Sequence, residues 1–294
     1  MEWTEQMYRP PQEAKSLLLR GSQGCTYNRC HFCYISRESP FGVVAPEEIE
    51  QELLRQIPLH PQNTRVYLFG SNPFSQSFGR LKEIAKVIKK HLPLCPEISM
   101  HARVTDIVGK SPEQLEELKH LGINHLYPGT ENGNDEALRL MNKGARAEQA
   151  LEQLRKLDEA GIAYTVNYII GMGGDGEGES SGIHTARLFN QLRPRRITTT
   201  GLTVFPHTPL YEMVQKGVFK EASEREKIAE TIAFVKHLNI ETTLDCGHYL
   251  NLLNFIADLP AQKAQALHMM SAFLQKYSEC EILEFYPRKH FTTL

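Results

Sequence analysis

Apolar residues follow two alternating rhythms along the chain. VYLFG (66–70) and EISMHARV (97–104) have the short apolar or alternating pattern of strands. RLKEIAKVIKK (80–90) places its apolar residues three and four apart, as a helix does. SPEQLEELKHLG (111–122) opens on a capping-box pattern and closes on a glycine, which indicates a complete helix. Strand and helix patterns take turns six times between residues 15 and 205.

This alternation predicts an α/β fold with a parallel sheet and right-handed crossovers. Six units are too few to close an eight-stranded barrel, so we expect a partial, open (β/α)6 TIM-like barrel with a mainly helical C-terminal extension. The expected parts are an N-terminal segment packing on the core (1–14), the core itself (15–215), and an extension that covers the substrate (216–294).

Loops rich in glycine, proline and polar residues follow the predicted strands. They are RGSQGCTYNRCHFCY (20–34), GSNPF (70–74), GTENG (129–133), GMGGDGEG (171–178) and FPHTP (205–209). In parallel β/α folds the chemistry gathers at the carboxyl ends of the strands. These loops together therefore predict one functional site at that rim.

Three cysteines, Cys25, Cys30 and Cys33, crowd the first of these loops. Three thiolates suit a [4Fe–4S] cluster that keeps one iron open for another ligand. The alternative is a tetrahedral zinc site, whose fourth ligand would be a distant residue such as Cys246 or His248. The local chemistry leaves both metals open.

Composition places the chain among ordinary globular proteins, with 41% hydrophobic and 23% charged residues. A formal net charge of −2 argues against membrane or stable nucleic-acid binding, because both favour a basic surface. The sequence shows neither a signal-peptide pattern nor an apolar run near the ~20 residues of a membrane span. We therefore expect a cytoplasmic protein with reduced cysteines, in which the scattered Cys95, Cys246 and Cys280 behave as small buried hydrophobes.

The segment GCTYNRCHFCY resembles the cluster loop of the radical S-adenosylmethionine (radical SAM) enzymes, whose usual spacing is C-x3-C-x2-C. Phe32 fills the aromatic position before the last cysteine, and one extra residue lies between the first two. The resemblance implies that Cys25, Cys30 and Cys33 hold a [4Fe–4S] cluster and that S-adenosylmethionine (SAM) is the second cofactor. It also implies that Phe32 lies near SAM.

The loops after the second and fourth predicted strands resemble SAM-binding motifs of the same superfamily. GSNPF stands where a Gly-Gly-Glu motif holds the methionine amino group, but Ser71 and Asn72 replace Gly-Glu, so a backbone carbonyl or Asn72 would make this contact. GTENGNDEALRLMNKG implies that Glu131 lies near the methionine or ribose end and that Lys143 pairs with the SAM carboxylate. Glu131 is alternatively a helix-start carboxylate, and Lys143 a solvated surface residue.

Two later segments resemble the motifs that surround the ribose and adenine of SAM. VNYIIGMGG implies contacts from Asn167 and Gly171, and TVFPHTPLYEM implies that the backbone around Val204 frames the adenine. Asn167 is alternatively an ordinary polar residue on a sheet face.

The implied chemistry starts when one electron cleaves SAM to a 5′-deoxyadenosyl radical, which abstracts hydrogen from a small-molecule substrate. An electron donor such as flavodoxin or ferredoxin is the implied partner. We expect specificity to come from YRPPQEAK (8–15) and from the tail beyond Pro206. The candidate substrate contacts are polar residues of one predicted strand and of the tail: His101, Arg103, Asp245, His248, Asn251 and Asn254. Their alternative roles are an internal ion pair for the first two and the polar face of a helix for the other four.

The layout of the chain resembles a branch of small stand-alone radical SAM proteins that includes the queuosine lyase type, which frees queuine for base salvage. This likeness rests on the YRPP segment before the cluster loop and on the His/Asn segment of the tail. Two alternatives stay open. One is a relative that handles tetrapyrroles, and the other is a non-catalytic iron–sulfur or zinc scaffold.

Overall fold

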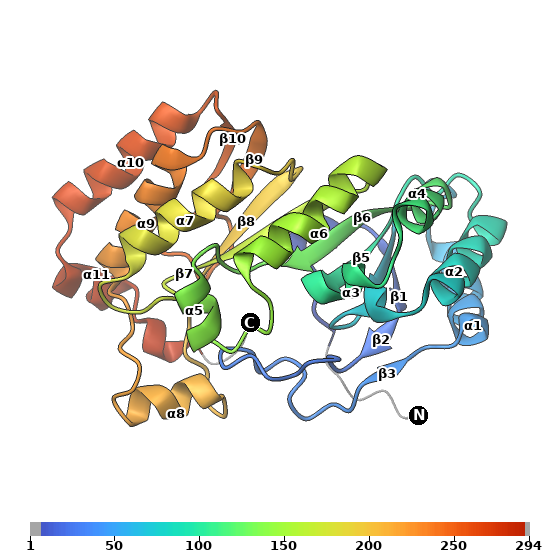
Figure 1. Ribbon diagram of the computed structural model, residues 1–294, viewed down its shortest axis with the longest axis horizontal. Helices are drawn as coiled ribbons and strands as arrows, with labels where there is room; N and C mark the ends of the chain where they lie inside the picture. The colour runs from blue at the N-terminus through green and yellow to red at the C-terminus, as the bar shows by residue number, and fades with distance from the viewer. Residues whose placement is uncertain (1–6, 292–294) are drawn as a thin grey trace. The chain divides into compact units, whose positions relative to one another are not determined.

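The computed structural model describes residues 7–291 and divides the chain into two compact units (Figure 1). The first unit comprises residues 1–28, 35–129 and 152–164, and the second comprises residues 29–34, 130–151 and 165–294. The three-cysteine loop is split between them, because Cys25 belongs to the first unit and Cys30 and Cys33 to the second. Each unit is described separately below.

The first unit is built on four parallel strands, each paired to the next. They are β1 (Leu17–Arg20), β4 (Val66–Phe69), β5 (Ile98–Arg103) and β6 (Ile123–Gly129). Two short strands, β2 (Ser22–Gln23) and β3 (Gly42–Val43), form an antiparallel ribbon. The helical segments of this part are η1 (Pro11–Glu13), α1 (Pro46–Gln56), η2 (Ile57–Leu59), η3 (Pro73–Ser75), α2 (Phe78–His91), α3 (Val104–Val108) and α4 (Pro112–His120).

The local signals of the sequence account for these helices. The hydroxyl of Ser111 accepts a hydrogen bond from the N–H of Gln114, whose side chain accepts from the N–H of Ser111, so the predicted capping box starts α4. Gly122 follows α4 with a φ of +99°, a conformation that glycine adopts without strain. In α1, Ile49 and Leu53 are buried, which confirms the predicted apolar face.

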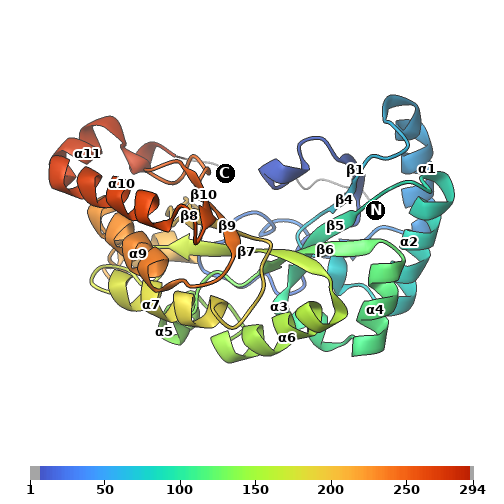
Figure 2. The ribbon, with the colours of Figure 1, turned by 90° about the horizontal axis from the view of Figure 1, so that it is seen from above.

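The second unit contains most of β7 and the strands that follow it. β7 (Ala163–Ile170) starts in the first unit, where it pairs with β6, and continues into the second. There β7, β8 (Arg196–Gly201) and β9 (Thr242–Asp245) pair in parallel, and β10 (Ile256–Leu259) joins β9 antiparallel. The remaining helical segments are α5 (Asp135–Leu140), α6 (Ala147–Ala160), α7 (Gly178–Phe189), α8 (Pro209–Gln215), α9 (Glu224–His237), α10 (Lys263–Lys276), α11 (Glu279–Phe285) and η4 (Arg288–His290). Helix α9 lies between α7 and α10 (Figure 2).

The strand order β1-β4-β5-β6-β7-β8-β9-β10 confirms the prediction of a mainly parallel α/β fold with six β/α units. The tail is helical in α9, α10 and α11, as expected, but it also adds β9 and β10, which the pattern did not predict. The boundaries expected after residues 14 and 215 stay predictions. Within residues 7–291, no helix has the length and apolar character needed to cross a membrane.

Candidate functional site

The segment that carries Cys30 and Cys33 lies against the end of α5 in the second unit. The backbone N–H of His31 donates to the carbonyl of Met141 (2.9 Å), and its ring Nδ1 lies 2.8 Å from the carbonyl oxygen of Leu140. The imidazole of His31 is therefore engaged by the backbone. This anchoring fixes the segment without using either neighbouring thiol.

The three clustered cysteines are half-buried and form no disulfide. The Sγ of Cys30 lies 3.9 Å from the carbonyl oxygen of Lys143. Of the other cysteines, Cys95 and Cys246 are buried as expected, and burial raises the pKa of both thiols. Cys280 is exposed, so the expectation that it would be a buried hydrophobe is wrong.

Asn72 holds the start of the cysteine loop in the first unit. Its side chain is fully buried, and its Nδ2 donates to the hydroxyl of Thr26 (2.7 Å) and to the carboxylate of Asp106 (3.0 Å). Its Oδ1 accepts from the N–H of Thr26 at 3.3 Å. Asn72 therefore fixes Thr26, the residue next to Cys25.

Arg103 also contacts the cysteine loop. Its guanidinium lies 4.6 Å from the ring centre of Tyr27 and donates to the hydroxyl of Thr26 at 3.3 Å. Its backbone N–H donates to Asp106 (2.7 Å), whose pKa is raised by burial. Arg103 is thus a neighbour of the loop that starts with Cys25.

The other two predicted residues of the first unit lie beside hydroxyl groups. The Nδ1 of His101 lies 2.7 Å from the hydroxyl of Tyr67, which is fully buried. The hydroxyls of Ser71 and Ser36 are hydrogen-bonded to each other. His101 therefore has a tyrosine partner.

Glu131, Lys143 and Asn167 come together in the second unit. The carboxylate of Glu131 accepts from the Nζ of Lys143 (3.0 Å) and from the Nδ2 of Asn167 (3.1 Å). Its backbone has a φ of +67° and bridges β7 through the carbonyl of Asn167 and the N–H of Ile169. A left-handed glutamate is strained and persists only where its surroundings hold it, and such residues gather at functional sites.

The structure excludes the alternatives considered for Glu131 and Lys143. Helix α5 begins at Asp135, capped by Asn134, so Glu131 is not a helix-start carboxylate. Lys143 is 9% exposed, which excludes a solvated surface lysine. The Oδ1 of Asn167 accepts from two threonine hydroxyls of β8, so its amide is oriented on both sides.

Phe32 and Val204 are far apart in sequence, but both pack against the same apolar cluster of the second unit. The buried members of the cluster are Ala137, Leu138, Met141, Ile169, Met172, Leu202, Leu210 and Phe219. Gly171 has a φ of +83°, and its N–H donates to the carboxylate of Glu230 (2.8 Å). These three predicted residues thus belong to the same region of the fold as Glu131.

The tail residues are engaged by their own loop. The Nδ2 of Asn251 donates to the carbonyls of Thr199 (2.8 Å) and Cys246 (2.9 Å). The Nδ2 of Asn254 donates to the carbonyls of His248 (3.0 Å) and Asn251 (2.9 Å). The segment between β9 and β10 is an irregular loop that contains a turn, so the alternative of a helix with a polar face is wrong, and both asparagines stabilise the loop.

Asp245 and His248 are likewise held within the second unit. Asp245 pairs with Arg196 (2.9 Å) and accepts from the N–H of Gly247. The Nδ1 of His248 accepts from the N–H of Leu250, the ring stacks on Tyr249, and burial lowers the pKa of the imidazole. Asp245 ends β9, and the other three tail residues lie in the loop that follows it, where their printed contacts support that loop.

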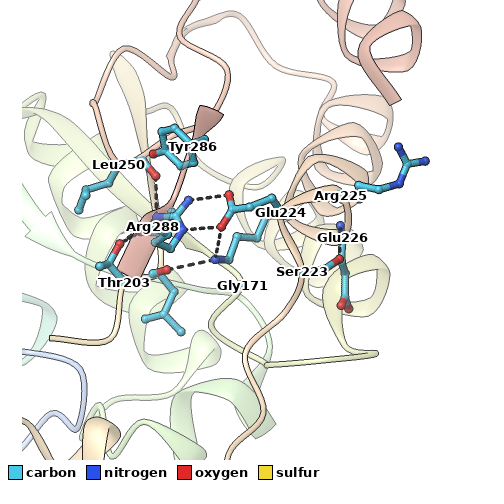
Figure 3. A network of polar contacts seen from close by, with 12 residues as sticks. Gly171, Thr203, Ser223, Glu224, Arg225, Glu226, Leu250, Tyr286 and Arg288 are labelled. Carbon is cyan, nitrogen blue, oxygen red and sulfur yellow. Dashed lines mark hydrogen bonds and ion pairs between the residues drawn. The ribbon is translucent and has the colours of Figure 1, made fainter. Parts of the chain in front are cut away.

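An ion-pair network that no motif indicated lies beside the loop after β8 (Figure 3). Arg288 forms a bidentate pair with Glu224 (2.5 and 2.8 Å), which also accepts from Lys227 (3.0 Å). Arg288 further donates to the hydroxyl of Thr203 (2.8 Å), and Lys227 to the carbonyl of Leu202 (3.3 Å). Burial and the Arg288 cation together lower the pKa of Lys227.

Sequence reasoning nominated Asn72, which stands in a recognisable motif. It missed four residues that no motif contains: Asp106, Glu224, Lys227 and Arg288. Arg288 meets Glu224 across 64 positions of the chain, and no local periodicity reports such a pairing.

Comparison with known proteins identifies the family. Residues 19–189 match the model of the radical SAM superfamily, so the chain belongs to this superfamily, whose members use a [4Fe–4S] cluster and SAM.

Two curated relatives match at 23% identity. The heme chaperone HemW of Bacillus subtilis aligns over 64% of this chain and 51% of its own length. The anaerobic magnesium-protoporphyrin IX monomethyl ester cyclase of Cereibacter sphaeroides aligns over 74% of this chain and 35% of its own length. The chain therefore spans about half or less of the curated relatives that it matches.

Solved structures share the fold at low sequence identity. Methylornithine synthase (PylB) matches with a TM-score of 0.56 and 16% identity, over 93% of this chain and 85% of the other. Coproporphyrinogen III oxidase (HemN) of Escherichia coli gives 0.51 and 18%, over 89% and 52%. The methyltransferase TsrM of Kitasatospora setae, solved with cobalamin and a [4Fe–4S] cluster bound, gives 0.54 and 18%, over 68% and 39%.

The residues present fit both cofactors of the superfamily. Three thiols outside any disulfide, none of them fully buried, form a soft donor set of the kind that binds iron–sulfur clusters. The Glu131–Lys143 pair offers both charges to a zwitterionic ligand, and the Phe32–Val204 cluster offers an apolar surface to a flat base.

Proposed function

We propose that this protein is a radical SAM enzyme in which Cys25, Cys30 and Cys33 hold one [4Fe–4S] cluster. When bound, the reduced cluster supplies the electron that splits SAM into methionine and a 5′-deoxyadenosyl radical, which abstracts hydrogen from a small-molecule substrate. The observation that carries the proposal is the buried network of Glu131, Lys143 and Asn167.

The side chains of this chain would bind and orient SAM. Glu131 supplies an acceptor that Lys143 and Asn167 hold in one rotamer, so little reorganisation is needed on binding. Phe32 and Val204 supply apolar surface that excludes water from the reactive end. The electron donor in this proposal is a small redox protein such as flavodoxin or ferredoxin.

The test is anaerobic reconstitution with iron and sulfide, followed by dithionite and SAM. We expect about four irons per chain and release of 5′-deoxyadenosine. Cys30→Ala should lose the brown chromophore and the product, because two thiolates cannot hold the cluster, whereas Cys280→Ala, a thiol outside the loop, should keep both. If Cys30→Ala keeps its iron, or if Cys246→Ala loses it, the ligand assignment is wrong.

The queuosine lyase assignment rests on the layout of the sequence alone. The tail residues proposed for that substrate are engaged by their own loop, which gives the assignment no added support. Incubation of the reduced enzyme with SAM and queuosine tests it directly, since release of queuine is the expected product of such a lyase.

A tetrapyrrole substrate is the second candidate. Both curated relatives and one structural neighbour are named for haem or porphyrin chemistry. At 23% identity or less this favours the class without selecting a compound. Hydrogen abstraction from a porphyrinogen, detected as a change in its absorption only when SAM is present, would separate this candidate from the lyase.

A further inference from the structure

The backbone around Cys25 is held on both sides. Gly24, directly before it, has a φ of +64°, and a Cβ at this position would lie 2.7 Å from the carbonyl oxygen of Ser39. Position 24 therefore requires glycine. Thr26, directly after Cys25, is bonded to Asn72 through both its N–H and its hydroxyl. Cys25 thus lies between a close backbone contact and a side-chain clamp.

The amide of Asn72 acts inside the protein, because protein atoms cover this residue completely. Both hydrogens of its Nδ2 are donated, one to the hydroxyl of Thr26 (2.7 Å) and one to the carboxylate of Asp106 (3.0 Å). Its Oδ1 accepts from the N–H of Thr26 (3.3 Å). These bonds fix the orientation of the amide, and its 0% exposure leaves no surface for a solute.

Asp106 orients Asn72 and is itself held in place. One carboxylate oxygen, Oδ2, accepts from Asn72 and from the backbone N–H of Arg103 (2.7 Å). The carbonyl of Asp106 accepts from the Nζ of Lys110 (3.0 Å), which also donates to the carbonyl of Phe74 (2.9 Å). Lys110 is 5% exposed, so a buried ammonium ties α3 to the GSNPF loop that carries Asn72.

The three clustered cysteines depend on different sets of contacts. Cys30 and Cys33 belong to the second unit, where His31 anchors their segment on α5. Cys25 belongs to the first unit, where the Asn72 clamp holds the residue next to it. Groups that orient the ligands of a metal centre contribute about ten- to hundred-fold to metal affinity without touching the metal.

We propose that Asn72 and Asp106 are positioning residues for Cys25. Asp106 orients the amide of Asn72, and this amide fixes Thr26 and with it the backbone from which Cys25 binds the cluster. The inference rests on the proposed function, because it needs the cluster on Cys25. It assigns Asn72, which stands where a SAM-binding motif is expected, to the cysteine loop.

Two exchanges of Thr26 test the clamp in the reconstituted protein. Thr26→Val keeps the shape of the side chain but leaves a buried donor of Asn72 without its acceptor, whereas Thr26→Ser keeps the hydroxyl. We expect a chelator to remove iron about ten-fold faster from Thr26→Val than from the parent, and at the parental rate from Thr26→Ser. Thr105→Val, the same exchange at a hydroxyl without a hydrogen-bond partner among residues 7–291, is the matched control.

The EPR spectrum of the reduced cluster separates positioning from general support of the fold. It should differ from the parental spectrum in Thr26→Val and in Asp106→Leu. Asp106→Asn should restore it, because an amide oxygen can accept the same two bonds as Oδ2. Melting temperatures recorded before reconstitution identify variants that are merely destabilised, and the exchange of the exposed Thr26 should leave this temperature unchanged.

The proposal is overturned if Thr26→Val loses iron at the parental rate and has the parental spectrum, or if Thr105→Val shows the same defect. A lower melting temperature of Thr26→Val with parental iron loss would assign the clamp to the fold alone. Release of 5′-deoxyadenosine is measured on the same preparations. A parent that binds iron without releasing this product would refute the proposed function and leave the positioning role, because iron loss is measured without SAM. A parent that takes up no iron would refute both.

Discussion

Two buried carboxylates, Glu13 in the first unit and Glu131 in the second, have very different surroundings. Glu13 is fully buried and accepts four hydrogen bonds, whereas the side chain of Glu131 is 12% exposed and accepts two. The donors to Glu13 are Ser16 (2.5 Å), Arg65 (2.9 Å), Ser99 (2.9 Å) and Tyr127 (2.5 Å). Glu13 is saturated, and Glu131 keeps capacity for a further donor.

The positions of the two groups explain the difference. Ser16 and Arg65, which both bind Glu13, directly precede β1 and β4. Glu13 therefore lies at the amino ends of two parallel strands, the end that serves stability in such folds. Glu131 follows the carboxyl end of β6, where such folds bind their ligands. Buried charge therefore serves the fold at one end and, in our proposal, SAM at the other.

Glu13, Glu97 and His125 could be mistaken for a metal site, because one potential ligand atom from each lies within 4.8 Å of the others. Arg65 pairs with both carboxylates, and the Nδ1 of His125 lies 3.0 Å from Glu97. The guanidinium already supplies the positive charge that a metal would bring, so this cluster belongs to the fold.

Glu13→Ala should have the largest effect on stability. It leaves three hydroxyl donors without their acceptor in a buried site and removes one of the two carboxylates that pair with Arg65, which typically costs about 3–5 kcal/mol of unfolding free energy. Urea denaturation measures this loss. A cost below about 1 kcal/mol would mean that the network is dispensable, and the contrast between the two ends would fail.

Glu131→Gln should show the opposite profile. We expect SAM to bind about ten- to hundred-fold more weakly, as for loss of a charged hydrogen bond, with little change in melting temperature. Glu136→Gln, an exposed carboxylate of α5 paired with Arg139, is the matched control and should alter neither quantity. Unchanged SAM affinity with a large loss of stability would assign Glu131 to the fold, like Glu13.

The contrast between Glu13 and Glu131 also shows which interactions can be predicted from the sequence. Glu131 stands in a motif, and its partner Lys143 is twelve positions away on the same stretch of chain, so both could be nominated. The partners of Glu13 lie up to 114 positions away and follow no periodicity. Strand order and capping were predictable for the same reason that Glu131 was, because their signals are local.

The tail shows a second limit of the sequence. For the segment between β9 and β10, the alternative considered was a helix with a polar, solvated face, but the structure has an irregular loop there. The buried amide of Asn251 instead binds carbonyls of two neighbouring segments, which makes a turn more stable than a helix there.

Asn251→Ala should lower the unfolding free energy by about 1–3 kcal/mol, because buried carbonyls lose their donor. Turnover per folded molecule should stay at the parental level if the residue supports only the turn. A selective rise in KM with unchanged stability would return Asn251 to the substrate contacts.

Glu230 is a third buried carboxylate, and its effect should appear in the pH dependence of the unfolding free energy. It accepts from the hydroxyl of Tyr168 (2.5 Å) and the N–H of Gly171, and burial raises its pKa to about 8. Between about pH 4.5 and 8 the folded protein therefore holds a proton that the unfolded chain has lost, so stability falls as pH rises by up to about 1 kcal/mol per unit. Glu230→Gln should flatten this slope in denaturation curves recorded from pH 5 to 8; an unchanged slope would show that Glu230 is not the source of this pH dependence.

The pairing of Arg288 with Glu224 has a consequence for the order of events during synthesis. Arg288 donates to the hydroxyl of Thr203, in the loop after β8, yet it leaves the ribosome 85 residues later. At about 5–20 residues per second, several seconds separate the emergence of that loop from the arrival of its last donor. During that interval the hydroxyl of Thr203 lacks its Arg288 donor, and this contact forms only after η4 has been translated.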